Sequence, residues 1–188
     1  MFRLFRPRFH PATIDSLYGV IVAQARVPDF YEEFGVPDSV DGRFELIVLH
    51  VALLTRRLGR ESEGAALASA LVDRFGRDMD DNLREMGVGD LTVPKKMKRM
   101  FEALYGRTRI YQSALDETGS DALEAALARN VFGGRGGAVA ALAAYVRRAA
   151  HELDAADGRQ ILAGRLAFPA PHAILADVAL TRSAETAR

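Results

Sequence analysis

Apolar residues recur along the chain at the three- and four-residue spacing of α-helices. From Ile14 to Ala25 they follow the i, i+3, i+4, i+7 rule, and the same spacing returns over residues 63–86 and 94–115. Further helices are predicted at residues 29–34, 43–58, 120–131, 139–153 and 161–166, with Ser120 as an N-cap and glycine or proline between most of the segments. The pattern predicts an all-α, single-domain helical bundle of about seven to eight helices.

The segment over residues 43–58 is apolar on most sides and is expected to be the central helix. A β-strand over residues 46–51 is the alternative, but the length of the run favours a helix. Asp38 or Asp41 is expected to cap its start by accepting backbone N–H bonds. His50 lies midway along it without a catalytic or metal-binding partner at helical spacing. We interpret His50 as a core or interface histidine with one hydrogen bond.

Composition excludes several classes of function. The 25 Lys and Arg residues balance 25 Asp and Glu residues, so no overall charge attracts nucleic acid or an anionic membrane. The chain has no cysteine, which removes disulfides and thiolate chemistry. Its uncharged stretches fall short of the ~20 residues that span a bilayer. Residues 1–12 form a basic, aromatic segment that we interpret as a tail, with contact at a membrane surface as the alternative. Residues 13–169 are expected to form the helical domain, and residues 170–188 a second tail.

An acidic cluster offers the strongest catalytic reading. Asp78, Asp81 and Glu85 fall within about 60° of each other on one helix, beside its apolar stripe. Such carboxylates can share a divalent cation, so a metal-dependent enzyme is one alternative. The second carboxylate helix that this chemistry requires is missing, and we expect no catalytic residue, cofactor or metal. We predict instead a structural ion-pair seam with Lys96 and Arg107, in which Asp78 or Asp81 is buried and paired.

A basic face and a group of methionines suggest contact surfaces. Lys95, Lys98, Arg99 and Arg109 project away from the apolar stripe of their helix. Positive charge near a helix N-terminus is disfavoured by ~0.3–1 kcal/mol per residue, so we predict that this face binds an anionic surface, with a plain solvated face as the alternative. Methionine is adaptable and suits a groove for an apolar segment, although a methionine-rich core is the simpler reading. The methionines concerned are Met79, Met86, Met97 and Met100.

Two blocks of sequence resemble a known family. The first is GVPDSVDGRFEL at residues 35–46, and the second is DMDDNLREMGVGDL at residues 78–91. Shorter matches follow at Lys95–Lys96, at residues 105–107 and at Arg129–Asn130. Together these segments are similar to the ubiquinol–cytochrome c chaperone family, and the likeness covers about residues 16–169.

The resemblance implies a non-catalytic, all-helical assembly factor that binds newly made cytochrome b for the respiratory bc1 complex. Mitochondrial relatives work beside the ribosome with a small co-chaperone, so both are possible partners here. The chain shows no long transit peptide, and we expect a bacterial, cytoplasmic member, with peripheral contact at the inner membrane left open. The expected partner- and client-binding residues are Lys95, Lys98, Arg99, Arg109, Asp38, Asp41, Arg43 and Met86. A helical carrier of a small ligand or lipid, with a cavity between helices, is the rival hypothesis.

Overall fold

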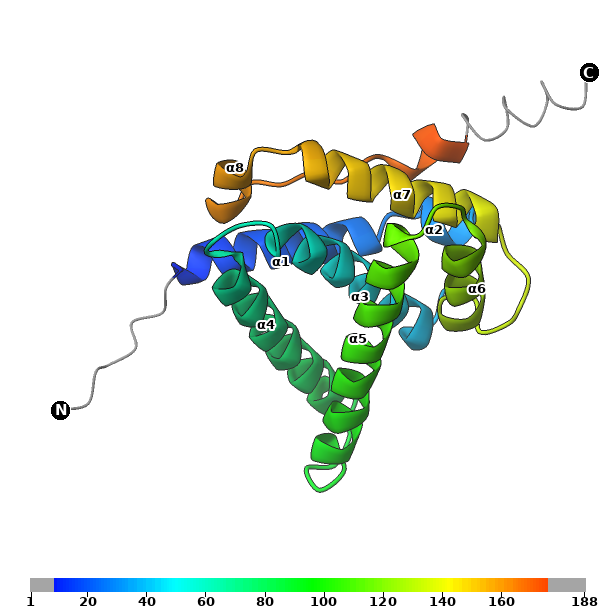
Figure 1. Ribbon diagram of the computed structural model, residues 1–188. Helices are drawn as coiled ribbons and strands as arrows, with labels where there is room; N and C mark the ends of the chain where they lie inside the picture. Colours follow the sequence, from blue (N-terminus) through cyan, green and yellow to red (C-terminus); the bar gives the residue numbers. More distant parts are fainter. Residues whose placement is uncertain (1–8, 176–188) are drawn as a thin grey trace, which may run out of the picture.

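Eight α-helices and the turns between them make up most of residues 9–175, the part of the chain that the computed structural model describes (Figure 1). They are α1 (Pro11–Ala25), α2 (Asp29–Glu32), α3 (Val40–Leu58), α4 (Gly64–Glu85), α5 (Val93–Asp116), α6 (Asp121–Asn130), α7 (Val139–Ala155) and α8 (Gly158–Leu162). Residues 9–175 contain no strand, which confirms the predicted all-α, single-domain bundle.

The ends of several helices differ from the prediction. Helix α1 begins at Pro11, inside the range 1–12 that was predicted to be a tail, and residues 171–175 are also helical. Helix α8 (Gly158–Leu162) begins three residues before the predicted range 161–166 and ends inside it, and Asp157 caps its start by accepting the N–H of Arg159 at 2.9 Å. Ser120 occupies the N-cap position of α6, but its side chain makes no capping hydrogen bond. The remainder of each predicted tail, residues 1–8 and 176–188, lies outside the described residues.

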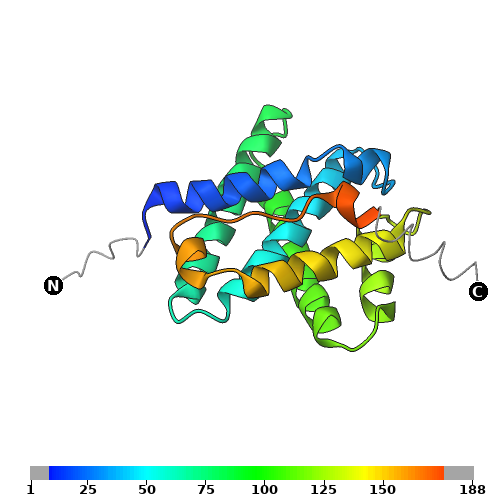
Figure 2. The same cartoon turned by 90° about the horizontal axis from the view of Figure 1, so that it is seen from above.

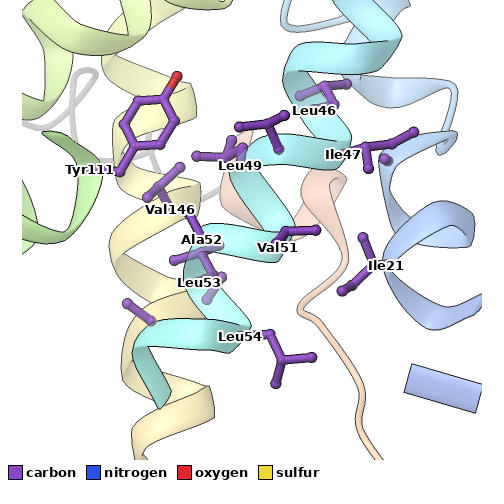
Figure 3. Close-up of a cluster of buried hydrophobic side chains, with 14 of the residues drawn as sticks. Ile21, Leu46, Ile47, Leu49, Val51, Ala52, Leu53, Leu54, Tyr111 and Val146 are labelled. Atoms are coloured by element: carbon purple, nitrogen blue, oxygen red, sulfur yellow. The ribbon is translucent and has the colours of Figure 1, made fainter. Parts of the chain in front are cut away.

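Helix α3 is the centre of the fold, as predicted, and packs against α1, α4, α5 and α7. Its apolar side chains point to every side, toward α1 and toward α7 alike (Figure 3). Leu46, Leu49 and Leu54 have no exposed surface. Fully burying a side chain of this size contributes about 1.5–3 kcal/mol, so this helix supplies much of the stability of the core.

Helices α4 and α5 form a hairpin that projects from one side of the molecule (Figure 1). The two helices converge toward the loop at residues 86–92, which forms the tip, while α1 and α7 lie across the opposite end. Their inner faces pack on α3. The hairpin therefore places the end of α4 and the start of α5 at an edge of the fold that few other elements cover.

A segment without regular structure, residues 163–170, returns across the molecule after α8. We call it the strap. It runs between α1 and α7 (Figure 2). The Ser16 hydroxyl donates to the carbonyl of Gly164 at 2.8 Å, and the Gln24 amide donates to the carbonyl of Pro169 at 2.9 Å. These bonds satisfy carbonyls that would otherwise lie partly buried without a donor.

Candidate functional site

An apolar groove opens where α3, α4 and α5 meet. Its volume is about 190 Å³, and its walls come from the start of α3, the last turns of α4 and one residue of α5. We call it the methionine groove. It is lined by Arg26, Val40, Arg43, Phe44, Ile47, Asp78, Met79, Asn82, Leu83, Met86 and Met100. Three of the four methionines singled out in the sequence lie here, while Met97 packs against the core elsewhere.

Large apolar side chains are exposed on two sides of this groove. Val40 of α3 is 62% exposed and Met86, at the end of α4, is 53% exposed, whereas Met79, which also lines the groove, is 6% exposed. Apolar side chains left open to water around a hollow are typical of a binding surface. Methionine can also change rotamer to fit different apolar partners. The groove is therefore suited to hold an apolar segment of another protein.

A more polar hollow adjoins the methionine groove. Its volume is about 430 Å³, and Val40, Phe44 and Met100 line both it and the methionine groove. We call it the arginine hollow. Its charged and amide side chains are Asp41, Glu45, Arg99, Arg107, Asn130 and Arg135. They come from α3, from α5, and from the end of α6 with the loop after it, so three separate parts of the chain meet around it.

Glu45 and Arg107 form a partly buried ion pair in the arginine hollow. Glu45 is 6% exposed, and the Nε of Arg107 lies 2.5 Å from its Oε2. Burial raises the pKa of the Glu45 carboxyl, and the guanidinium of Arg107 acts against that rise. A buried carboxylate without a partner costs several kcal/mol. The Glu45 carboxylate of α3 is therefore stabilised by the Arg107 side chain of α5. Sequence reasoning missed Glu45, although an acid inside the most apolar helix was a signal of a buried pair.

The predicted ion-pair seam between α4 and α5 does not form, because Asp78 faces another helix. Its carboxylate accepts a hydrogen bond from the Tyr18 hydroxyl of α1 at 2.9 Å. In projection, Asp78 is turned about 100° from Met79 toward one side of the apolar stripe. Gly76, on the other side, lies against the Phe101 ring of α5. The side of α4 that carries Asp78 therefore looks toward α1.

The remaining members of the predicted seam point into solvent. Asp81, Glu85 and Lys96 are exposed and make no ion pair with any residue between positions 9 and 175. Asp78 is partly buried, and its nearest charged partner is Arg74, at 3.7 Å. Within the same range, no group of three or more His, Asp or Glu side chains is placed to hold a metal ion. The alternative of a metal-dependent enzyme therefore loses its proposed ligand cluster.

The N-terminus of α3 is capped by a residue that was not predicted to be its cap. The hydroxyl of Ser39 accepts the N–H of Gly42 at 3.1 Å, so Ser39 is the N-cap and not Asp38 or Asp41. Helix α3 begins at Val40, three residues before the predicted start, which shifts the capping position. Asp38 instead pairs with Arg43 at 2.8 Å on the surface. Asp41 lies exposed in the first turn, where its charge suits the helix dipole.

The four residues of the predicted basic face are all exposed on α5, but they do not act as one uniform patch. Lys98 lies 3.9 Å from Glu102, one turn further along the helix. Arg99 lines the arginine hollow. Lys95 and Arg109 make no ion pair with a described residue. Glu102 therefore offsets the charge of Lys98, and Arg99 belongs to the arginine hollow.

His50 is completely buried, which agrees with the core interpretation, but it makes two hydrogen bonds and not one. Its Nδ1 lies 2.7 Å from the carbonyl of Leu46, and its Nε2 lies 2.8 Å from the hydroxyl of Tyr145. A carbonyl can only accept, so Nδ1 carries the proton and Nε2 accepts from Tyr145. Phe168 of the strap closes edge-on over the ring. Burial lowers the pKa of His50 to about 4, which keeps it neutral.

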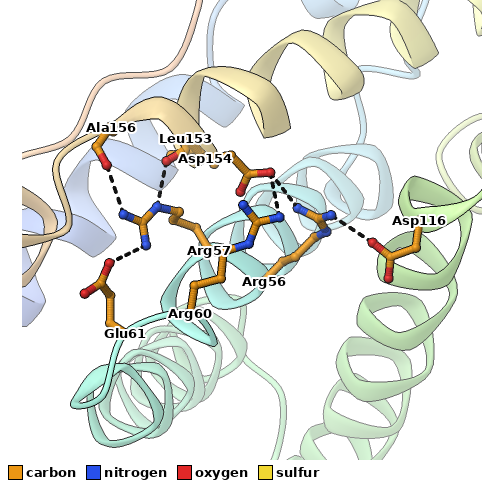
Figure 4. Close-up of polar contacts among 8 residues, drawn as sticks. All are labelled: Arg56, Arg57, Arg60, Glu61, Asp116, Leu153, Asp154 and Ala156. Carbon is orange, nitrogen blue, oxygen red and sulfur yellow. Dashed lines mark hydrogen bonds and ion pairs between the residues drawn. The ribbon is translucent and has the colours of Figure 1, made fainter.

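Arg57 lies near the end of the helix predicted over residues 43–58; it is 5% exposed and joins three parts of the chain (Figure 4). Its guanidinium donates to the carbonyls of Leu153 and Ala156 at 2.7 and 2.9 Å and to Glu61 at 2.7 Å. These carbonyls belong to the last turn of α7, which has no further helical donors. Arg57 therefore caps α7.

Beside it, Arg56 and Arg60 both contact Asp154 of α7, at 3.0 and 2.9 Å (Figure 4). Arg56 also reaches Asp116 at the end of α5, at 2.8 Å. This cluster lies at the far end of α3 from the two hollows, and every charged group in it has a partner. We interpret it as structural.

The comparison with known proteins decides the family. The sequence profile of the ubiquinol-cytochrome C chaperones matches residues 32–168. The chain belongs to this family. It is 25% identical over 150 residues to the ubiquinol-cytochrome-c reductase complex assembly factor 1 of Xenopus laevis, a match that covers 78% of this chain and 74% of that protein. It also resembles the crystal structure of the Cbp3 homolog from Brucella abortus, with a TM-score of 0.78, 37% identity, and coverage of 86% of this chain and 91% of that one.

The two blocks on which the family resemblance rests meet at the methionine groove. Val40, Arg43 and Phe44 come from the block at residues 35–46, and the α4 residues of the groove come from the block at residues 78–91. Asn130, from a shorter match, lies in the adjoining arginine hollow. No helix within residues 9–175 combines the length and apolar character that crossing a bilayer requires.

Proposed function

We propose that this chain is a non-catalytic assembly chaperone of the respiratory bc1 complex, and that it binds newly made cytochrome b through the methionine groove. The observation that carries the proposal is the meeting of the two family blocks around an open apolar groove. Membership of a family named for chaperoning ubiquinol–cytochrome c components supports the choice of complex. The name of the Xenopus relative, an assembly factor of that complex, supports it independently.

The rival hypothesis of a carrier for a small ligand or lipid fits the groove less well. Sites for small molecules usually have volumes of about 300–1,000 Å³ and enclose most of the ligand. The methionine groove, which is the more apolar part of this surface, has a volume of only about 190 Å³, and the larger hollow of about 430 Å³ that adjoins it is ringed by charged side chains. It also has highly exposed apolar side chains on two of its sides, which a carrier would leave in water after loading. Side chains of a polypeptide suit this shape better.

Site-directed photo-crosslinking tests the proposal. A photoreactive amino acid replaces Met86 beside the groove, and a matched control replaces His151, which is exposed on α7. Both proteins are produced in bacteria that make a bc1 complex and lack their own family member. Newly made cytochrome b is expected to crosslink at position 86 and not at position 151. Equal yields at both positions would contradict the groove assignment.

A functional readout uses the same position. Met86→Asp is expected to reduce the amount of assembled bc1 complex, because a carboxylate in the groove must be desolvated when an apolar segment binds. Met86→Leu keeps the apolar surface and is expected to support normal assembly. Both variants should accumulate normally, since the side chain is half exposed. Full assembly with the aspartate variant would exclude the groove as the client site.

A contact between the basic face and the ribosome is a second proposal, supported by the exposure of Lys95, Lys98, Arg99 and Arg109. Replacing Lys95, Lys98 and Arg99 together with Glu should leave the fold intact and weaken co-sedimentation with ribosomes. The binding of the native protein should weaken steeply with salt, because neutralised phosphates release counterions. Normal co-sedimentation and normal bc1 levels with the triple variant would leave this face as ordinary solvated surface.

A further inference from the structure

The methionine groove and the arginine hollow form one continuous surface. Val40, Phe44 and Met100 line both, so a chain that follows the groove across these three side chains enters the hollow without leaving the protein. The two halves differ in character. The groove is lined by seven apolar side chains and by Arg26, Arg43, Asp78 and Asn82, whereas the hollow has the three arginines Arg99, Arg107 and Arg135 around it. An occupant of both halves must therefore change character along its length.

The charges of the arginine hollow are not balanced internally. Arg107 is neutralised by Glu45, which it contacts directly. Arg99 and Arg135 are exposed and make no ion pair with any residue from 9 to 175. Asp41 is the one further acid of the lining, and it lies in the first turn of α3, where the helix dipole partly offsets its charge. The hollow is left with two guanidinium groups that have hydrogen-bond donors to offer.

Guanidinium groups bind carboxylates with paired, charge-assisted hydrogen bonds. The phosphates of RNA could accept hydrogen bonds from the same guanidinium groups, but the charged backbone of RNA would not match the apolar lining of the methionine groove. We propose that the occupant is a polypeptide segment that is apolar where it lies in the methionine groove and carries an Asp or Glu side chain where it crosses the arginine hollow. This inference rests on the proposed function and adds the chemical signature by which the client segment is recognised.

A pair of synthetic peptides tests the signature. Each carries a fluorescent label and a helix of ~15 residues, ~22 Å long, that is rich in Leu and Ala. One helix ends in two Glu residues and the other in two Gln residues, so they differ only in charge. Fluorescence anisotropy then gives the affinity of each peptide for the full-length native protein. The Glu peptide is expected to bind about tenfold more tightly, with a preference that shrinks as salt is added.

Variants assign the preference to the hollow. The double substitution Arg99→Gln and Arg135→Gln is expected to remove the preference for Glu while leaving the Gln peptide bound. Arg109→Gln removes a cation from the same helix outside the hollow, and it should keep the preference. Circular dichroism is expected to show an unchanged fold in both, because all three side chains are exposed.

The possible failures point to different causes. If the native protein binds both peptides equally and Met86→Asp abolishes both, the groove binds apolar segments and the acidic signature is wrong. If the preference survives the Arg99 and Arg135 substitutions, the carboxylate is recognised elsewhere and the inference is overturned. If neither peptide binds the native protein, the groove does not hold apolar helices, and the inference falls together with the proposed site.

Discussion

The buried imidazole of His50 predicts how the stability of this protein depends on pH. The unfolded chain should protonate this histidine near its ordinary pKa of about 6.5, whereas the folded protein resists protonation down to about 4. Between these values the unfolded state binds a proton that the folded state excludes. The free energy of unfolding should therefore be unaffected by His50 above about pH 7, fall as the pH drops from about 6.5, and level off below about pH 4.

The size of the effect follows from the difference between the two pKa values. Each unit corresponds to about 1.4 kcal/mol, so the full loss is about 3 kcal/mol and the loss at pH ~4.5 is about 2.5 kcal/mol. A loss of this size is a large fraction of the stability of a typical domain. Other groups also titrate in this range. The raised pKa of Glu45, for example, favours the folded state at low pH and acts in the opposite direction.

The variant His50→Gln isolates the contribution of the histidine. Glutamine can donate and accept hydrogen bonds, as the neutral imidazole does, but it does not titrate. Urea unfolding is measured for both proteins at about pH 7.5 and about pH 4.5. The variant is expected to be the less stable protein at the higher pH, because the ring contacts are lost. Its further loss at the lower pH should be about 2.5 kcal/mol smaller than that of the native protein. Equal losses in the two proteins would show that His50 does not control the acid response.

Two smaller tests concern the start of α3. Ser39→Ala should lower the free energy of unfolding by about 1 kcal/mol, because the Gly42 N–H loses its acceptor, whereas Asp41→Ala should change it less. A larger effect from Asp41 in thermal melts would restore the original capping prediction. Gly42→Ala should destabilise by about 2 kcal/mol or more, because its Cβ would lie 2.0 Å from the carbonyl oxygen of Pro37. Gly106→Ala is the control, because a Cβ there meets no atom within 4 Å, and it should stabilise α5 by about 0.5–1 kcal/mol. Similar melting temperatures for Gly42→Ala and Gly106→Ala would mean that the loop before α3 can move away from the added Cβ.

The positions of the helices could be predicted because apolar periodicity is a local property of the sequence. The central place of α3 followed from the same pattern, since a helix that is apolar on every side must be covered on every side. The start of α3 was misplaced by three residues, and this error alone moved the predicted cap from Ser39 to the neighbouring aspartates. Helix ends depend on single hydrogen bonds, which periodicity does not report.

The contacts between helices could not be predicted in the same way. The sequence placed Asp78 beside the apolar stripe of α4, but only the packing determines that α1 lies on that side and α5 on the other. Arg107 was available to any acid within reach, and Glu45 became its partner because α3 lies beneath it. The sequence analysis offered a methionine-lined groove only beside the simpler interpretation of a methionine-rich core, and it did not predict the arginine hollow, because the residues of the hollow come from three distant segments of the chain.

The strap has a consequence for the order in which this protein can be completed during synthesis. Phe168 packs against His50 of α3, and Gln24 of α1 donates to the carbonyl of Pro169. The helices that are synthesised first are therefore covered by residues that leave the ribosome late. Until then the imidazole has its bond to Leu46 but no cover on that side. A nascent chain of which only α1 to α7 have left the ribosome would thus have these helices but would lack the strap that covers them. The interior of this protein is therefore expected to close only after the strap has been translated.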